Sequence, residues 1–461
     1  MSESVAAAIA VNRFGLGARP GELAAASHDP RQWLLRQLDG EPPELKDSRL
    51  QGSAEILSQA WNLRREAGSA GAGGGDEREA RPASANAAQQ LMRFYRRIYV
   101  AEATARVRHA VTTDRSFLER LTHFWTNHFA VSVDKLAVLG LAGSLEREAV
   151  RPNVLGTFAD LLLAVERHPA MLFYLDNPRS VGPDSPAARA MRRRRGRDAG
   201  LNENLAREIL ELHTLGVDGG YAQADVIALA QMLTGWSING ERGRFEFRPA
   251  MHEPGARKLL GRRYADAGYE QAEAALRDLA VHPSTARHVA RRLACHFIAD
   301  DPSAAAVERI ANAFLESRGD LPTVYRALID TPEAWERPLP KYKTPSDYII
   351  SGFRGLQLPV VSDRHLLGSF ELLGQQIYAP GSPAGWPDRS ADWDGAWALM
   401  RRIEWADAIG QRLGSQRNAA RLAPQLLGAN LREETRKALA HAASGAQALT
   451  LLLVSPEFLR R

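Results

Sequence analysis

Histidine and carboxylate side chains fall on the apolar faces of three predicted helices. In the helix predicted over 115–131, an apolar line at i, i+4 and i+7 consists of Phe117, Leu121 and Phe124, and His128 continues it at i+11. The imidazole of His128 should therefore be buried, whereas His123 should face solvent. In the helix predicted over 202–216, Glu208 and Glu211 share a face beside an apolar line and should be half-buried, while His213 points elsewhere. In the helix predicted over 223–236, Asp225 also lies in an apolar stripe.

Burying an unpaired charge costs several kcal/mol, so these groups should pair with one another, with an arginine or with a metal. One interpretation is a carboxylate–histidine site that binds a divalent metal and supports metal-assisted hydrolysis. Its metal candidates are His128, Glu208 and Glu211, and its catalytic candidates add Asp225 and the loop histidine His252. Imidazole and oxygen ligands favour zinc, manganese or iron.

The other interpretation is structural, and the sequence leaves both open. Glu203, Arg207 and Glu211 are spaced for an ion-pair ladder, and His128 need only bond a backbone carbonyl. The chain contains no G-x-S-x-G nucleophile motif and no phosphate-binding G-x-x-x-x-G-K-[ST] motif. Its single cysteine, Cys295, reads as a core residue and excludes an intramolecular disulfide.

Tryptophans crowd into residues 386–405. Trp393, Trp397 and Met400 form a helical stripe, which is typical of core packing. The alternative is a carbohydrate-binding platform in which Trp386 stacks on a sugar.

Two segments are predicted to be flexible insertions. Residues 68–88 are rich in glycine, alanine and charge, and residues 179–200 are rich in arginine. The arginine run is either a solvated loop or a docking patch for an acidic partner, with Arg192, Arg193, Arg194 and Arg195 as the partner-binding candidates.

The elements that must position these groups are helices, and we expect an all-α, multi-helix single domain over 1–461 with at most a small β-hairpin near 244–262. Further helices are predicted over residues 31–39, 88–112, 145–175, 270–281, 284–298, 303–318, 321–330, 344–356, 392–413 and 433–454. No apolar stretch is long enough for a membrane span, and the net charge of +5 is too small to predict a nucleic-acid partner. No signal-peptide pattern is seen, so we expect a cytoplasmic protein, or alternatively one exported together with a partner.

Several phrases, taken in order, resemble a known family. They are AVNRFGLGARPGE (10–22), LTHFWTNHFAVS (121–132), NENLAREILELHTLGVDGGYAQADVIALAQMLTGW (202–236), HEPGARKLLG (252–261), HPSTARHVARRLACHF (282–297), YKTPSDYI (342–349), AGWPDRSADW (384–393) and LLLVSPEFLRR (451–461). Together they resemble the bacterial family called domain of unknown function eighteen-hundred over essentially the whole chain. The resemblance implies a helical fold and no agreed reaction.

The resemblance also implies a partner, because family members are often encoded beside an exported sulfatase-like protein. The leading expectation is therefore an interaction or assembly partner of such a protein. The chain departs from the family pattern at Ala222, where threonine would cap the helix that follows. Asp225 should then lack the capping-box partner that threonine supplies. It also departs at Glu253, where aspartate is usual.

Overall fold

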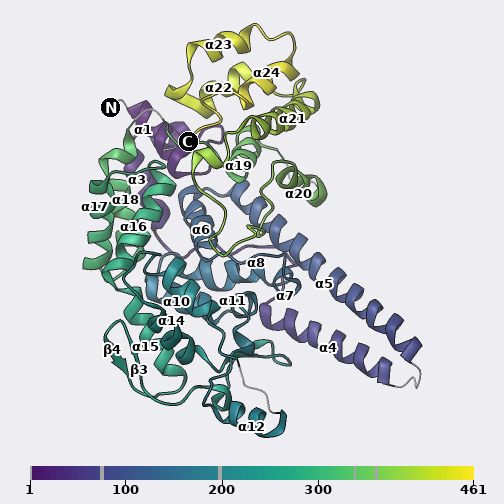
Figure 1. Cartoon of the computed structure of the whole chain (residues 1–461). Helices are drawn as coiled ribbons and strands as arrows, with labels where there is room; N and C mark the ends of the chain where they lie inside the picture. The colour runs from purple at the N-terminus through teal and green to yellow at the C-terminus, as the bar shows by residue number, and fades with distance from the viewer. Residues whose placement is uncertain (1–2, 73–76, 196–199, 337–338, 359–361) are drawn as a thin grey trace.

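The computed structural model describes residues 3–72, 77–195, 200–336, 339–358 and 362–461. Helices make up most of these residues, which confirms the predicted mainly α fold (Figure 1). Within this part of the chain, no helix combines the length and the apolar character that a membrane span requires.

The N-terminal third of the chain is helical and contains the buried helix α6 (Ser116–His128). The elements are α1 (Glu3–Ile9), η1 (Ala10–Phe14), α2 (Glu22–Ser27), α3 (Pro30–Leu35), η2 (Arg36–Leu38), α4 (Ser53–Ala72), α5 (Glu77–Thr112), α6 (Ser116–His128), α7 (Leu136–Leu139), α8 (Ala142–Leu145) and η3 (Glu146–Val150). Helix α6 is buried on nearly every side: Phe117 and Leu121 are buried on its apolar face, and Glu119, Arg120 and Thr122 are buried on its other faces. Helices α4 and α5 pair and project from the body (Figure 1). Residues 73–76, inside the predicted insertion 68–88, lie outside the described residues.

The middle third adds helices and two small hairpins. The elements are α9 (Arg151–Asn153), α10 (Phe158–Arg167), α11 (Pro169–Tyr174), η4 (Asn177–Arg179), α12 (Pro186–Arg195), α13 (Asn204–Glu208), η5 (Ile209–His213), α14 (Gln223–Leu233), β1 (Trp236–Asn239), β2 (Arg244–Phe247), η6 (Pro249–Met251), β3 (Arg257–Leu259), β4 (Arg262–Tyr264), α15 (Tyr269–Ala280) and α16 (Pro283–Phe297). Strands β1 and β2 pair antiparallel with Trp236 opposite Phe247, and β3 and β4 pair with Arg257 opposite Tyr264.

The C-terminal third is again helical, and its helices pack against neighbours. The elements are α17 (Ala304–Glu316), α18 (Leu321–Asp330), η7 (Pro332–Trp335), α19 (Pro345–Leu356), α20 (Asp363–Leu372), η8 (Ser390–Asp392), α21 (Ala396–Leu413), α22 (Ala419–Leu427), η9 (Gly428–Asn430), α23 (Glu433–Ala440) and α24 (Gly445–Leu453). Helices α16, α17 and α18 pack in sequence, and α21 packs against α24. The segment 459–461 returns to residues 341–343, where the backbone N–H of Lys343 donates to the carbonyl of Leu459 at 2.9 Å.

Three predicted helices are shorter than their periodicity suggested. The helix predicted over 145–175 is broken, because Thr157 caps a new helix and His168 caps another that starts at Pro169. The helix predicted over 223–236 ends at Leu233, since Gly235 has a φ of +83° and Trp236 begins a strand. The helix predicted over 433–454 is interrupted before Ser444, whose side chain caps α24.

Candidate functional site

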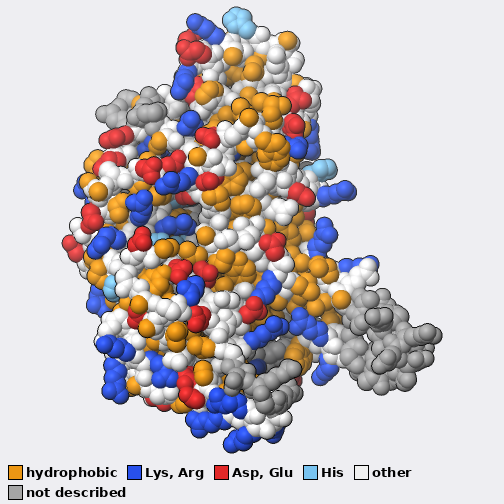
Figure 2. All heavy atoms as spheres, viewed as in Figure 1, with side chains coloured by type: hydrophobic (Ala, Val, Ile, Leu, Met, Phe, Trp, Pro, Cys, Tyr) orange, Lys and Arg blue, Asp and Glu red, His pale blue; other side chains and the backbone are white. Residues whose placement is uncertain are grey.

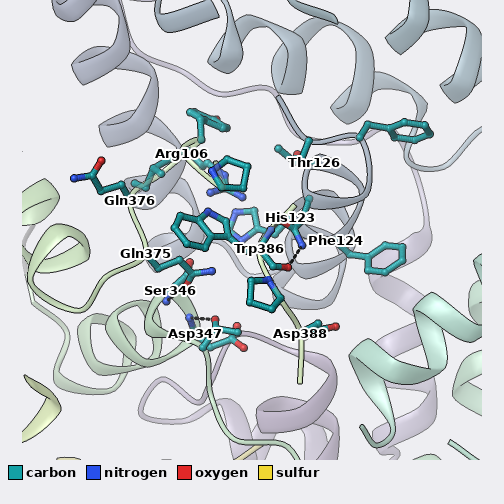
Figure 3. A pocket seen from close by; sticks show the side chains of 18 of the residues that line it. Arg106, His123, Phe124, Thr126, Ser346, Asp347, Gln375, Gln376, Trp386 and Asp388 are labelled. Atoms are coloured by element: carbon teal, nitrogen blue, oxygen red, sulfur yellow. Dashed lines mark hydrogen bonds between the residues drawn. The ribbon is translucent and has the colours of Figure 1, made fainter. Parts of the chain in front are cut away.

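A cavity of about 100 Å³ opens beside α6, where segments far apart in the sequence meet (Figure 3). Its walls come from α5, α6, α8, α16, the start of α19 and the segment 375–388. The polar and aromatic residues that line it include Arg106, Arg120, His123, Asn127, Arg292, His296, Ser346, Asp347, Gln375, Gln376, Tyr378, Trp386 and Asp388. Five of the phrases that carry the family resemblance, 10–22, 121–132, 282–297, 342–349 and 384–393, each supply lining residues.

An ion network supports the α6 side of the cavity. Arg151 forms two hydrogen bonds with Glu119, at 2.6 and 2.9 Å, and one with Glu146 at 2.9 Å. Arg106 pairs with Glu146 at 2.7 Å, and the Nε2 atom of His123 lies 3.2 Å from Glu119. Burial alone would raise the pKa of Glu119, but Arg151 and the neighbouring histidines hold it well below its usual value. Burial would likewise raise the pKa of Glu146, but Arg106 and Arg151 lower it, so both carboxylates are ionised and fix the positions of Arg106 and His123.

On the other side of the cavity, Asp388 orients the imidazole of His296. The Nδ1–H group of His296 donates to Asp388 at 2.8 Å, whereas Nε2 is buried and has no hydrogen-bond partner among the described residues. Burial is the main cause that lowers the pKa of His296 to about 4, against the opposing effect of Asp388. The imidazole is therefore neutral near pH 7, and Nε2 is left as a proton acceptor.

Asp347 and Arg461 hold this pair in place. Asp347 forms ion pairs with Arg120 at 2.9 Å and with Arg461 at 2.8 Å. Arg461 also donates to the backbone carbonyl of His296 at 2.7 Å and lies 3.4 Å from Asp388. Burial would raise the pKa of Asp388, but His296, Lys341 and Arg461 keep it well below its usual value.

The segment 375–388 is fastened to α6 by a reciprocal clamp. The Asn127 side chain donates to the Trp386 carbonyl at 2.9 Å and accepts from the Trp386 N–H at 2.8 Å. The preceding residue must be glycine, because Gly385 has a φ of +79° and a Cβ there would lie 2.3 Å from the Asn127 carbonyl oxygen. Figure 3 shows the result: Trp386 lies beside His123, with Arg106 on one side and Asp347 and Asp388 on the other.

This arrangement pairs a base with a group that orients it. A neutral imidazole whose Nδ1–H is held by a carboxylate can accept a proton at Nε2 from water or from a substrate hydroxyl. Nearby arginines can stabilise negative charge that develops on the substrate.

The predicted site residues are not assembled as expected. His128 is buried, as predicted, but its Nε2 contacts the backbone carbonyl of His213 at 3.1 Å and its ring packs against Trp125 and Phe129. His123, expected to face solvent, lines the cavity instead. The prediction assumed one wet face, whereas α6 is enclosed by other elements.

His213, which was expected to point away from Glu208 and Glu211, lies in a π-turn formed by Ile209–His213. His213 is fully buried and its Nδ1 lies 2.7 Å from the buried Glu166. Glu208 and Glu211 are half-buried, and Glu211 joins the ladder with Arg207.

Asp225 and His252 have structural partners. Asp225 accepts from the backbone N–H of Ala222 at 2.9 Å and of Leu260 at 2.8 Å. Asp225 therefore makes its own half of a capping box, the bond to the N-cap N–H, which we had not expected at a helix that starts after alanine. The other half is missing because the Ala222 side chain has no hydrogen-bond acceptor. His252 is buried, with Nδ1 2.9 Å from the Thr234 carbonyl oxygen.

Over the ranges that the structure describes, no three His, Cys, Asp or Glu side chains lie together in a way that could hold a metal ion. The predicted ligands His128, Glu208 and Glu211 are therefore not brought into one metal site. His213 rather than His128 is the histidine that acts electrostatically on Glu208.

The tryptophan stripe was predicted incorrectly in part. Trp393 and Trp405 are buried, but Trp397 and Met400 are 61% and 54% exposed on α21. Trp386 is partly buried in the cavity wall.

The arginine run belongs to α12. Arg192, Arg193 and Arg194 are exposed there, and Figure 2 shows Lys and Arg side chains gathered at that end of the molecule. The side chain of Arg195 and residues 196–199 lie outside the described residues.

Comparison with known proteins gives one family. The model described as "Protein of unknown function (DUF1800)" matches residues 9–460. No curated protein and no solved structure matches the chain.

Proposed function

Since this chain belongs to the DUF1800 family, we propose that it is an enzyme whose active site is the cavity beside α6, with His296 as general base and Asp388 as the residue that orients it. The observation that carries this proposal is that His296 lines the cavity with Nδ1 fixed by Asp388 at 2.8 Å and with a buried Nε2 that has no hydrogen-bond partner among the described residues. His128, His213 and His252 also each have one buried nitrogen without such a partner, but none of them lines the cavity.

The surroundings favour hydrolysis or a related group transfer. His296 takes a proton from water or from a substrate hydroxyl, and the oxygen attacks an electrophilic centre held in the cavity. Trp386 and Phe124 are among the apolar residues of the wall, and the ring centroids of Phe124 and His296 lie 5.4 Å apart. Asp388 stays ionised and stabilises the imidazolium that forms, while Asp347 and Arg461 keep both groups in place.

The His296→Asn variant tests this role. Loss of a general base lowers the rate by about 100-fold or more, so we expect that fall in kcat/KM for any ester that the wild type hydrolyses. The assay uses 4-nitrophenyl acetate, phosphate and sulfate, and His441→Asn, at an exposed histidine, is the control. Equal turnover by His296→Asn and the wild type, or no turnover of any of the three esters, would contradict the proposal.

A second proposal is that the chain also works as an interaction or assembly partner of a sulfatase-like protein, as the resemblance implies. It is supported by the exposed Trp397 and Met400, which lie three residues apart on one side of α21. Large apolar side chains exposed together are typical of protein–protein contacts.

The Trp397→Ser, Met400→Ser double variant tests that surface. After co-expression with a sulfatase-like protein from the same gene neighbourhood, the wild type should co-elute with it in size-exclusion chromatography, and the double variant should not. A Val217→Ser variant, which removes an exposed apolar side chain elsewhere, should co-elute as the wild type does. Separate elution of the wild type would exclude the partner role.

A further inference from the structure

Arg292 is a cation in the cavity wall that no carboxylate neutralises. It lies on α16, one turn before His296, so both side chains are on the same side of the helix, and both line the cavity. Arg292 is half-buried, and among the described residues it forms no ion pair and no side-chain hydrogen bond. Burial is the main cause that lowers the pKa values of His128 and His288, and the charge of Arg292 lowers both further, so its positive potential reaches the surrounding interior.

The other charged groups of the cavity are already paired. Arg106 is held by Glu146, and Arg120 by Asp347. Asp388 accepts a hydrogen bond from His296 and lies close to two cations, Arg461 and Lys341, whose Nζ atom is 3.8 Å away. Among the described residues, Arg292 is therefore the lining arginine without a carboxylate partner, and a half-buried charge without a partner is costly.

We infer that the cavity binds an oxyanion, the carboxylate, phosphate or sulfate group of its ligand, and that Arg292 pairs with it. A volume of about 100 Å³ holds several water molecules and hence one such group. The planar guanidinium offers two parallel N–H donors to such a group. The imidazole of His296 then lies one helical turn from the bound anion, beside the bond to be attacked. This inference rests on the proposed function for the location of the site and names its substrate class.

The test is calorimetric titration of the purified chain with inorganic phosphate, sulfate and acetate. We expect at least one of them to bind the wild type, and Arg292→Ala to weaken that binding by about tenfold or more, as loss of a charge-assisted hydrogen bond implies. Comparing the three anions shows which oxyanion geometry the cavity prefers. Thermal unfolding should show that Arg292→Ala is as stable as the wild type, because it breaks no internal ion pair.

Two matched variants make the outcome specific. Arg291→Ala removes the neighbouring arginine, which is exposed and does not line the cavity, and should bind as the wild type does. His296→Asn should lose turnover but keep anion binding, so that failure of the general-base proposal and failure of this inference can be told apart. Absence of binding by the wild type, or equal weakening by Arg291→Ala and Arg292→Ala, would overturn the inference.

Discussion

Replacement of Arg151 by alanine is expected to lower the free energy of unfolding by about 3–5 kcal/mol, the usual result of removing one partner from a buried ion pair. Arg151 is the cation shared by Glu119 and Glu146, and all three side chains are almost fully buried. Without it, two carboxylates remain in the interior, and their remaining ionic partners among the described residues are Arg106, His109 and His123. The measurement is urea-induced unfolding followed by circular dichroism.

Arg207 offers the matched control for this variant. It forms a ladder with Glu203 and Glu211, and its side chain is 38% exposed. Exposed pairs of this kind contribute about 0–1 kcal/mol, so Arg207→Ala should scarcely change the unfolding midpoint. If Arg151→Ala were no less stable than Arg207→Ala, the network would not have the structural role that we assign to it.

The second large effect is a loss of stability in acid, between about pH 6.5 and pH 4. Burial lowers the pKa values of His288 and His296 from 6.5 to about 4 in the folded chain. Protonation therefore favours the unfolded chain, so the contribution of each histidine is complete above its unfolded pKa and is lost as the pH falls through its folded pKa. Each contributes on the order of 3 kcal/mol by this linkage.

The pH dependence of urea unfolding measures this contribution. His288→Gln should reduce the loss of stability between pH 6.5 and pH 4, whereas a substitution at the exposed His441 should leave that loss unchanged. The carboxylates Glu119, Glu146 and Asp347, whose pKa values are also lowered, add a further loss below about pH 4.5. A stability that is constant from pH 7 to pH 4 would contradict the burial of these neutral imidazoles.

The helical fold could be predicted from the sequence because periodicity and capping are local properties. The line through Phe117, Leu121 and Phe124 is carried by neighbours on one helix, and Asp29 and Thr344 cap the helices that start at the prolines after them. Predictions failed where the surroundings of a helix decide which of its faces are buried. His123 was expected to face solvent, but α6 is enclosed by other elements and His123 lines the cavity.

The candidate site could not be predicted, because it depends on contacts between distant segments. His296 and Asp388 are 92 residues apart in the sequence, and Asp347 and Arg461, which form an ion pair, are 114 residues apart. Both regions lie in phrases that carry the family resemblance, and this was the one sequence signal that could have directed attention to them. Helical periodicity identifies which face is buried, but not which buried faces meet.

The most direct test of the active-site proposal is a crystal structure of the chain soaked with phosphate or sulfate. We predict an oxyanion paired with Arg292 inside the cavity, with an oxygen or an ordered water molecule within hydrogen-bond distance of Nε2 of His296. A well-resolved cavity that contains no anion, or a His296 whose Nε2 bonds to a protein group, would contradict the account.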